Sequence, residues 1–249
     1  MGGLDVRYYT AGQGDPLVVV HGGGGDAATW LNNIRVLAES YTVYAPDLPG
    51  FGESEPLDGD YYIPELTTFI GDFSDSLGLE SFHLVGHSIG GGIALNYALA
   101  SPHRIKKLVL ISSLCMGSEI AFWIRLVCLP ARYISSVLMA GFHCMKWIFK
   151  NLLAPFKLVM PITRAGMGFG KRITTLTEQT LVLADRFSEI MMPTLLVWGA
   201  KDPIVPVQQA YAAAQIIPDC QVLIFENQGH DVHRRELTQF SRVLKGFLG

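Results

Sequence analysis

The chain has 249 residues, enough for one large domain or for one domain with a small insertion. Charged residues make up 16% of it and hydrophobic residues 49%, so the composition excludes a disordered chain. The formal net charge of −3 argues against a nucleic-acid-binding protein, because contacts with phosphate groups require an excess of clustered basic residues.

Short apolar runs alternate with helix-like segments along most of the chain. The runs expected to be buried strands are Leu17 to Val20, Tyr41 to Ala45, Phe82 to Val85, Lys107 to Ile111, Thr194 to Trp198 and Gln221 to Phe225. The segments expected to be helices are 27–39, 65–77, 89–100, 207–216 and 232–248. This alternation predicts an α/β fold with a mostly parallel, doubly wound sheet.

The alternation stops after Ile111 and resumes at Pro193. The intervening segment is rich in Leu, Ile, Met and Phe, and prolines divide it into helix-length pieces. We therefore expect a core of residues 1–113 and 191–249, with an inserted helical cap over residues 114–190.

Charge is distributed unevenly between these parts. Residues 1–103 hold 13 acidic and two basic residues, whereas residues 120–177 hold eight basic residues and no acidic one. The N-terminus lacks a basic, apolar leader, and no uncharged apolar run reaches the roughly 18 residues of a membrane span. We expect a cytoplasmic monomer or homodimer.

The strongest chemical signal is the sequence Gly86-His87-Ser88-Ile89-Gly90, which lies between a predicted strand and a predicted helix. A serine in this context can occupy a strained turn that exposes its hydroxyl at the carboxyl edge of the sheet. A Cβ at either flanking glycine would collide with the neighbouring strand or helix. Ser88 is therefore the predicted nucleophile, and the neighbouring His87 is interpreted first as a packing residue.

A serine hydroxyl needs a base, and the base needs a carboxylate to orient it. His230 follows the last predicted strand after a short loop, so we expect it at the same edge, with His233 in the next helix and facing away. Asp202 follows the strand Thr194 to Trp198 and is the predicted acid. Asp231 is the rival, but a residue adjacent to His230 rarely turns back onto its imidazole.

An oxyanion requires preorganised backbone N–H donors. Ile89 would supply one from the turn, and Gly23 the other from the glycine-rich loop that follows Val20, with Gly22 and Gly24 as near rivals. A phosphate-binding loop is excluded, because no Gly-Lys-Ser/Thr follows. A metal at His230, Asp231 and His233 is not favoured, since it would leave Ser88 without a base. No cofactor or metal is expected.

Five motifs carry a resemblance to the α/β-hydrolase family over essentially the whole chain. They are HGGGG at 21–25, DLPGFGES at 47–54, GHSIGG at 86–91, WGAKDPIVP at 198–206 and GH at 229–230. The chain looks most like capped bacterial carboxylesterases and is also similar to C–C bond hydrolases of aromatic ring-cleavage products. The resemblance implies a loop near the pocket at DLPGFGES and a lid over the pocket between Ser113 and about Ile190.

The predicted cap allows three interpretations. We favour an ordinary buried lid whose lysines are solvated. The alternatives are an apolar pocket for acyl or aromatic groups and a surface for membrane contact. Trp123 in the cap, together with Gly22, Gly24 and His87, is expected to line the substrate site.

The expected function is hydrolysis of small-molecule carboxylic esters through an acyl-enzyme, with a Ser88, His230 and Asp202 triad. One alternative is C–C bond cleavage of diketo acids, in which Arg125 or Arg164 would hold the substrate carboxylate. The other is a non-enzymatic ligand receptor that signals by moving its cap.

Overall fold

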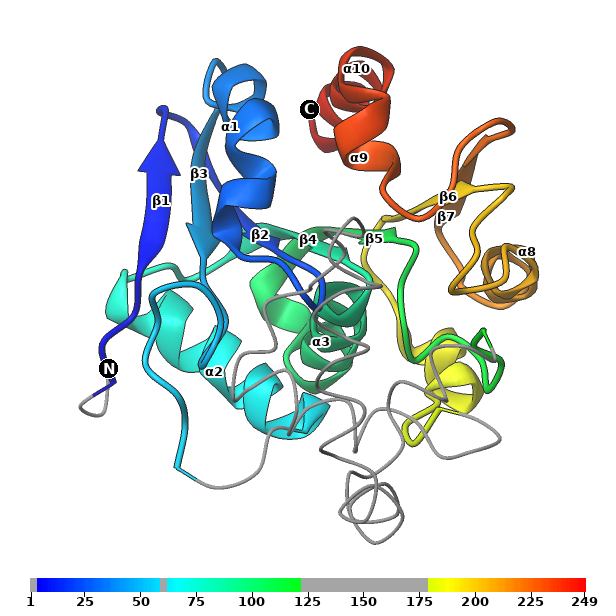
Figure 1. Ribbon diagram of the computed structural model, residues 1–249, viewed down its shortest axis with the longest axis horizontal. Coiled ribbons are helices and arrows are strands. Elements are labelled where there is room, and N and C mark those ends of the chain that lie inside the picture. Colours follow the sequence, from blue (N-terminus) through cyan, green and yellow to red (C-terminus); the bar gives the residue numbers. More distant parts are fainter. Residues whose placement is uncertain (1–3, 59–61, 122–178) are drawn as a thin grey trace, which may run out of the picture.

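The computed structural model describes residues 4–58, 62–121 and 179–249, and within them seven strands form one sheet. Their order is β1-β3-β2-β4-β5-β6-β7. The strands are β1 (Tyr8–Ala11), β2 (Asp15–Val20), β3 (Tyr41–Pro46), β4 (Phe82–His87), β5 (Ile105–Ile111), β6 (Thr194–Gly199) and β7 (Cys220–Phe225). Only β1 runs antiparallel to its neighbour, β3 (Figure 1). The prediction of a mostly parallel α/β sheet is confirmed.

The apolar runs become strands because both faces of the sheet are covered. Every residue of β4 and of β6 is buried, as expected for parallel strands with helices on either side. All six expected strands are present, and β1 was not expected. It is a four-residue edge strand with half-exposed residues, so its sequence, Tyr8-Tyr9-Thr10-Ala11, carries no apolar run.

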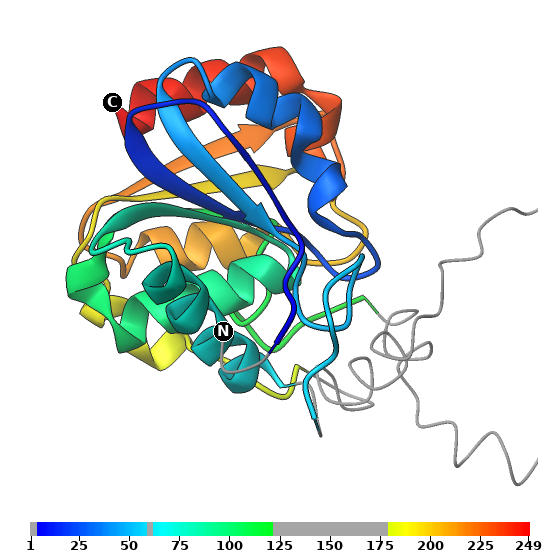
Figure 2. The same cartoon turned by 90° about the vertical axis from the view of Figure 1, so that its left-hand side faces the viewer.

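Helices cover the two faces of the sheet in separate layers (Figures 1 and 2). One layer contains η1 (Ala27–Trp30), α1 (Leu31–Leu37), α9 (Val232–Arg235) and α10 (Leu237–Leu248). The other contains α2 (Ile63–Ser76), α3 (Ile89–Ala100) and α8 (Gln208–Ala214). Short 3₁₀ turns, η2 (Pro102–Arg104) and η3 (Ala184–Glu189), complete the described elements.

The last expected helix, 232–248, is two helices in the structure. The backbone leaves helical geometry at Glu236, with φ −113° and ψ 42°. The Glu236 carboxylate accepts a hydrogen bond from the Gln228 side chain in the loop that precedes α9. The break thus lets α10 lie on the sheet while α9 stays close to the preceding loop.

The sheet reverses its winding between β2 and β4. The chain leaves β2 through α1 on one face and enters β4 from α2 on the other, and β2 pairs with both β3 and β4. Loops that leave adjacent strands in opposite directions create a crevice at the carboxyl edge, where ligands bind in open α/β sheets. The glycine-rich loop after β2 and Ser88 after β4 both lie at this carboxyl edge.

The two described ends of the expected insertion lie together on the core. Gln179 is 3% exposed; its Oε1 accepts a hydrogen bond from the Cys115 amide (2.8 Å), and its Nε2 donates to the Glu119 carbonyl (3.1 Å). The Leu183 amide donates to the Cys115 carbonyl. The limits predicted for the cap, 114–190, stay a prediction, because residues 122–178 lie outside the described residues.

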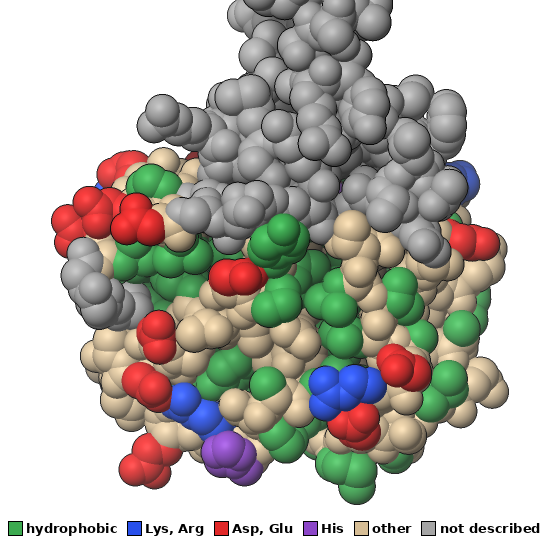
Figure 3. Space-filling model, turned by 90° about the horizontal axis from the view of Figure 1, so that it is seen from below, with side chains coloured by type: hydrophobic (Ala, Val, Ile, Leu, Met, Phe, Trp, Pro, Cys, Tyr) green, Lys and Arg blue, Asp and Glu red, His purple; other side chains and the backbone are tan. Residues whose placement is uncertain are grey.

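The described surface is the acidic part of the chain. Seen from the side of α2 and α3, acidic side chains are scattered over it with small apolar areas between them (Figure 3). All eight basic residues of segment 120–177 lie outside the described residues. No helix in the described ranges has the length and apolar character needed to cross a bilayer.

Replacing Gln179 with Ala should lower the free energy of unfolding by about 1–3 kcal/mol, because the buried Cys115 amide loses its acceptor. Urea denaturation measures the change. Gln208→Ala, at an exposed position, is the control and should change the value by less than about 0.5 kcal/mol. Equal effects of the two substitutions would contradict the role assigned to Gln179.

Candidate functional site

Ser88 occupies the sharp turn between β4 and α3. Its backbone has φ 55° and ψ −116°, a conformation that costs a non-glycine residue on the order of 1–3 kcal/mol. Backbone hydrogen bonds hold this geometry: the Ser88 amide donates to the Ile111 carbonyl (2.9 Å), and the Ser88 carbonyl accepts from the amides of Gly92 (3.1 Å) and Leu114 (3.0 Å). The turn predicted from the sequence is present at the carboxyl end of a central strand.

Two glycines make this turn possible through close backbone approach. A Cβ on Gly86 would lie 2.2 Å from the Gly90 carbonyl oxygen, at the start of α3. A Cβ on Gly90 would lie 2.6 Å from the Val20 carbonyl oxygen at the end of β2 and 2.5 Å from that of His21. Both collisions expected from the sequence are therefore found, one with the helix and one with the strand.

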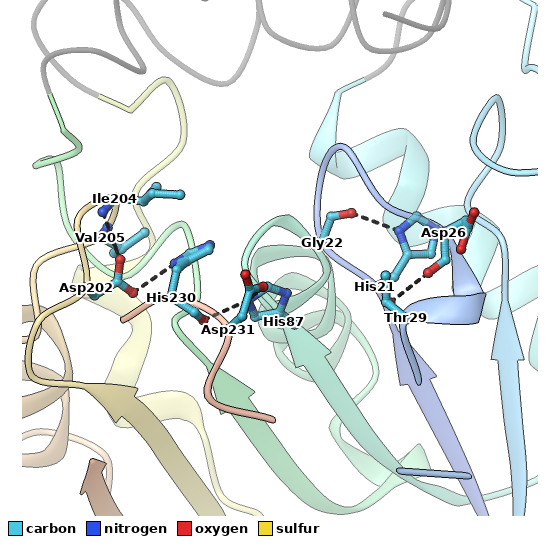
Figure 4. A network of polar contacts seen from close by, with 10 residues as sticks. All are labelled: His21, Gly22, Asp26, Thr29, His87, Asp202, Ile204, Val205, His230 and Asp231. Atoms are coloured by element: carbon cyan, nitrogen blue, oxygen red, sulfur yellow. Dashed lines mark hydrogen bonds and ion pairs between the residues drawn. The ribbon is translucent and has the colours of Figure 1, made fainter. Parts of the chain in front are cut away.

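An imidazole and a carboxylate meet at the same edge of the sheet (Figure 4). His230 Nδ1 lies 2.8 Å from Asp202 Oδ2, and the Asp202 side chain is fully buried. The other carboxylate oxygen, Oδ1, accepts hydrogen bonds from the amides of Ile204 (2.8 Å) and Val205 (3.1 Å). A carboxylate held in this way favours the tautomer in which His230 carries its proton on Nδ1, leaving Nε2 free to accept one.

Ser88 follows β4 and His230 lies in the loop after β7, so both are at the carboxyl edge of the sheet. No hydrogen bond joins Ser88 Oγ to the His230 imidazole in the described structure. The ring of His87, the residue before Ser88, lies 4.8 Å from the His230 ring, centroid to centroid. Hydrogen bonds between nucleophile and base are often long without substrate and tighten in the complex.

The glycine-rich loop after β2 lies directly against the turn at Ser88. A Cβ on Gly22 would lie 3.2 Å from Ser88 Cβ, and one on Gly23 would lie 2.5 Å from Ile89 Cδ1. Gly24 has φ 75°, the left-handed region that glycine tolerates. The loop therefore brings bare backbone beside Ser88, where the oxyanion donors, the amides of Gly23 and Ile89, were expected.

His21 fixes the peptide group between Gly22 and Gly23. The Leu48 amide donates to His21 Nε2 (2.9 Å), so the imidazole proton resides on Nδ1, which lies 2.9 Å from the Gly22 carbonyl oxygen. Burial lowers the pKa of His21, which keeps the ring neutral. Because a peptide unit is planar and trans, holding this carbonyl also sets the direction of the Gly23 N–H.

Asp47, in the motif at 47–54, ties two loops together. It is 3% exposed; its Oδ1 accepts a hydrogen bond from the Ala27 amide (2.7 Å), and its Oδ2 accepts one from the Glu53 amide (2.9 Å). The roles of His21 and Asp47 were not predicted, although both belong to quoted motifs. An acidic residue and a histidine directly after buried strands were the available signal.

The remaining residues considered for the site lie in different environments. His87 is 6% exposed and contacts the loop that carries His230. Asp231 lies 3.9 Å from His87 Nε2 through its Oδ1, and it is Asp202 that holds His230 Nδ1. His233, expected to face away, is in α9 and packs between the rings of Trp30 and His87. Trp123 lies outside the described residues.

In the part of the chain that the structure describes, no group of three or more His, Cys, Asp or Glu side chains is arranged to hold a metal ion. His230, Asp231 and His233 are accordingly not gathered around one point, since His233 points into the core at 1% exposure.

Comparison with known proteins identifies the family of the chain. The sequence pattern of the family described as alpha/beta hydrolase fold matches residues 15–127 and 154–234. The chain is 31% identical over 254 residues to the dihydrolipoyllysine-residue acetyltransferase component of an acetoin cleaving system from Cupriavidus necator. That match covers 99% of this chain and 67% of that protein.

Two further relatives have names that specify a reaction or a substrate. The 2-hydroxy-6-oxo-6-phenylhexa-2,4-dienoate hydrolase of Burkholderia cepacia is 29% identical over 259 residues, covering 96% of this chain and 89% of that protein. The crystal structure of a bacterial membrane phospholipase A superposes with a TM-score of 0.77 at 27% identity, covering 98% of this chain and 82% of the other.

Gly86→Ala should destabilise the protein by at least about 2 kcal/mol, since its Cβ would overlap the Gly90 carbonyl oxygen and backbone must shift. Gly246→Ala is the matched control. It lies inside α10 with nothing within 4 Å of the added Cβ, and it should stabilise the protein by about 0.5–1 kcal/mol. Thermal and urea unfolding of both variants measure the difference, and similar shifts in both would refute the steric argument.

Proposed function

The chain belongs to the α/β-hydrolase fold family, and we propose that it is a serine hydrolase that cleaves carboxylic esters through an acyl-enzyme intermediate. The proposal rests on one observation above all: Ser88 stands on a strained turn beside bare glycine backbone, at the edge where a buried carboxylate holds His230. Nucleophile, base and orienting acid are the three parts that acyl transfer by a serine requires.

In the proposed reaction, Ser88 Oγ attacks the ester carbonyl carbon while His230 Nε2 takes the hydroxyl proton. The imidazolium that forms is stabilised by the Asp202 carboxylate, which accepts hydrogen bonds from two backbone amides and is shielded from water. The amides of Ile89 and Gly23 would hold the oxyanion. His230 then returns its proton to the leaving alcohol.

The second half of the cycle repeats the first with water as the nucleophile. His230 accepts a proton from water as the hydroxide adds to the acyl carbon, and it returns that proton to Ser88 Oγ as the carboxylic acid leaves. Every proton is accounted for within Ser88, His230 and the substrates, so this chemistry calls for no cofactor.

Ser88→Ala should reduce hydrolysis of a short p-nitrophenyl ester to background while the melting temperature changes little, because alanine fits the same backbone turn but lacks the hydroxyl that acts as nucleophile.

Asp202→Asn should lower kcat by about 10³–10⁴-fold, because an amide favours the wrong imidazole tautomer. Steady-state rates and thermal melts check both. Undiminished turnover by folded Ser88→Ala would refute the proposed nucleophile.

A second candidate reaction is hydrolysis of a C–C bond in a ring-cleavage product. It is favoured by the relative from Burkholderia cepacia, whose name specifies such a substrate and which matches 96% of this chain. The basic residues proposed to hold the substrate carboxylate, Arg125 and Arg164, lie outside the described residues.

The two reactions separate in one experiment. Purified protein is assayed in parallel with p-nitrophenyl esters of graded acyl length and with 2-hydroxy-6-oxo-6-phenylhexa-2,4-dienoate, whose absorbance falls on cleavage. We expect kcat/KM for the best ester to exceed that for the dienoate by at least about tenfold, a transition-state difference of about 1.4 kcal/mol. The reverse ratio would replace ester hydrolysis by C–C hydrolysis.

A further inference from the structure

His87 touches the three segments that the proposed reaction needs. It directly precedes Ser88 on β4, and its Nε2 lies 3.1 Å from the His230 carbonyl oxygen (Figure 4). On its other edge, Nδ1 lies against the glycine-rich loop, where a Cβ on Gly22 would approach it to 2.7 Å. One side chain is thus packed between the proposed nucleophile, base loop and oxyanion loop.

The chemistry of the contact with His230 sets its direction. A carbonyl oxygen can only accept, so His87 must donate from a protonated Nε2. Burial holds the pKa of His87 well below its ordinary value, and the cation of Arg234 lowers it further, against the raising effect of the bond to the His230 carbonyl. The ring is therefore neutral, with one donor, and that donor is directed at the base loop.

Hydrogen bonds on either side of His230 anchor the loop that carries it, among them the bond between the Gln228 and Glu236 side chains. Asn33 Nδ2 donates to the His233 carbonyl (3.0 Å) at the far end of the segment, and the Lys201 amide donates to the Gln228 carbonyl (3.0 Å) ahead of it. Between these anchors, His87 holds the backbone of His230 itself, and Asp202 holds its ring. Backbone and ring together fix where Nε2 of His230 can point.

We propose that His87 is a positioning residue, whose Nε2–H holds the His230 carbonyl and thereby sets the imidazole in reach of Ser88. This inference rests on the proposed function, since it assigns a task within the same site. It replaces the expectation that His87 lines the substrate pocket, because its side chain is only 8% exposed and its polar edge is engaged by the protein.

Three substitutions separate a donor from mere bulk. In Gln the amide nitrogen is three bonds from Cβ, as Nε2 is in His, so His87→Gln keeps a donor at the carbonyl. In Asn the nitrogen is two bonds from Cβ and falls short, and Leu has no donor. We expect His87→Gln to keep kcat within about threefold, and His87→Asn and His87→Leu to lose about 10–100-fold in kcat with KM within about twofold, because misplacement of a reacting group by about 1 Å costs that much.

A second readout follows the reactivity of Ser88 directly. The rate at which a fluorophosphonate labels Ser88 should fall in His87→Asn and His87→Leu in parallel with kcat and recover in His87→Gln. Thermal melts confirm that the compared variants are folded. A structural role alone would lower the melting temperature without this pattern of loss and recovery.

His83 provides the matched control. It lies on the same strand, is 3% exposed and packs against Tyr41 at the other end of β4. His83→Gln, His83→Asn and His83→Leu should leave kcat unchanged. Wild-type kcat in His87→Asn and His87→Leu, or equal losses in all three His87 variants, would overturn the inference. Retained activity in Ser88→Ala would instead overturn the proposed function, so the two failures are distinguishable.

Discussion

The whole site depends on one close approach of backbone to backbone, at the turn between β4 and α3. Gly86 and Gly90 let the start of α3 pack onto the end of β4 and against β2 with no side chain between them. Only with that spacing can Ser88 take its positive φ and stand at the edge of the sheet. The hydrogen bond from the Ser88 amide to Ile111 on β5 shows that the strain is offset by pairing that continues past the strand end.

The groups around Ser88 come from loops that are far apart in the sequence. Parallel strands align their carboxyl ends, so the loops after β2, β6 and β7 reach the same edge regardless of their separation in the chain. Buried polar side chains then fix these loops. His21 and Asp47 hold the Gly22 carbonyl and the Ala27 amide in the loop after β2, and Asp202, after β6, holds the ring of His230, after β7. Buried donors and acceptors that satisfy one another make these loops rigid.

Most of the fold could be predicted from the sequence, because the strands of a parallel sheet that is covered on both faces are continuous apolar runs. The missed strand, β1, is at the edge and half-exposed, so its pairing with β3 is decided by tertiary contact and not by its residues. The break at Glu236 was missed for a similar reason, since it depends on a side chain from the preceding loop.

The candidate site divides along the same line. Ser88, Asp202 and His230 could be chosen because each follows a recognisable strand, and the bond between the last two is present in the structure. His87 could not be assigned a contact with the His230 carbonyl, because no local pattern reports where a side chain on β4 points relative to a loop that follows β7. Positions in the sheet are encoded locally, whereas partners across it are set by the assembled fold.

The buried imidazoles make the stability of the fold depend on pH. Burial lowers the pKa of His83 to about 4 and that of His233 to about 3, and it also lowers the pKa of His21 and of His87. In the unfolded chain these rings become protonated near pH 6.5, whereas in the folded chain they become protonated only at much lower pH. The contribution of these rings to stability is therefore complete above pH 6.5 and is lost on acidification towards the folded pKa values. Histidines that pack as neutral rings inside the fold therefore also make the native state less stable in acid.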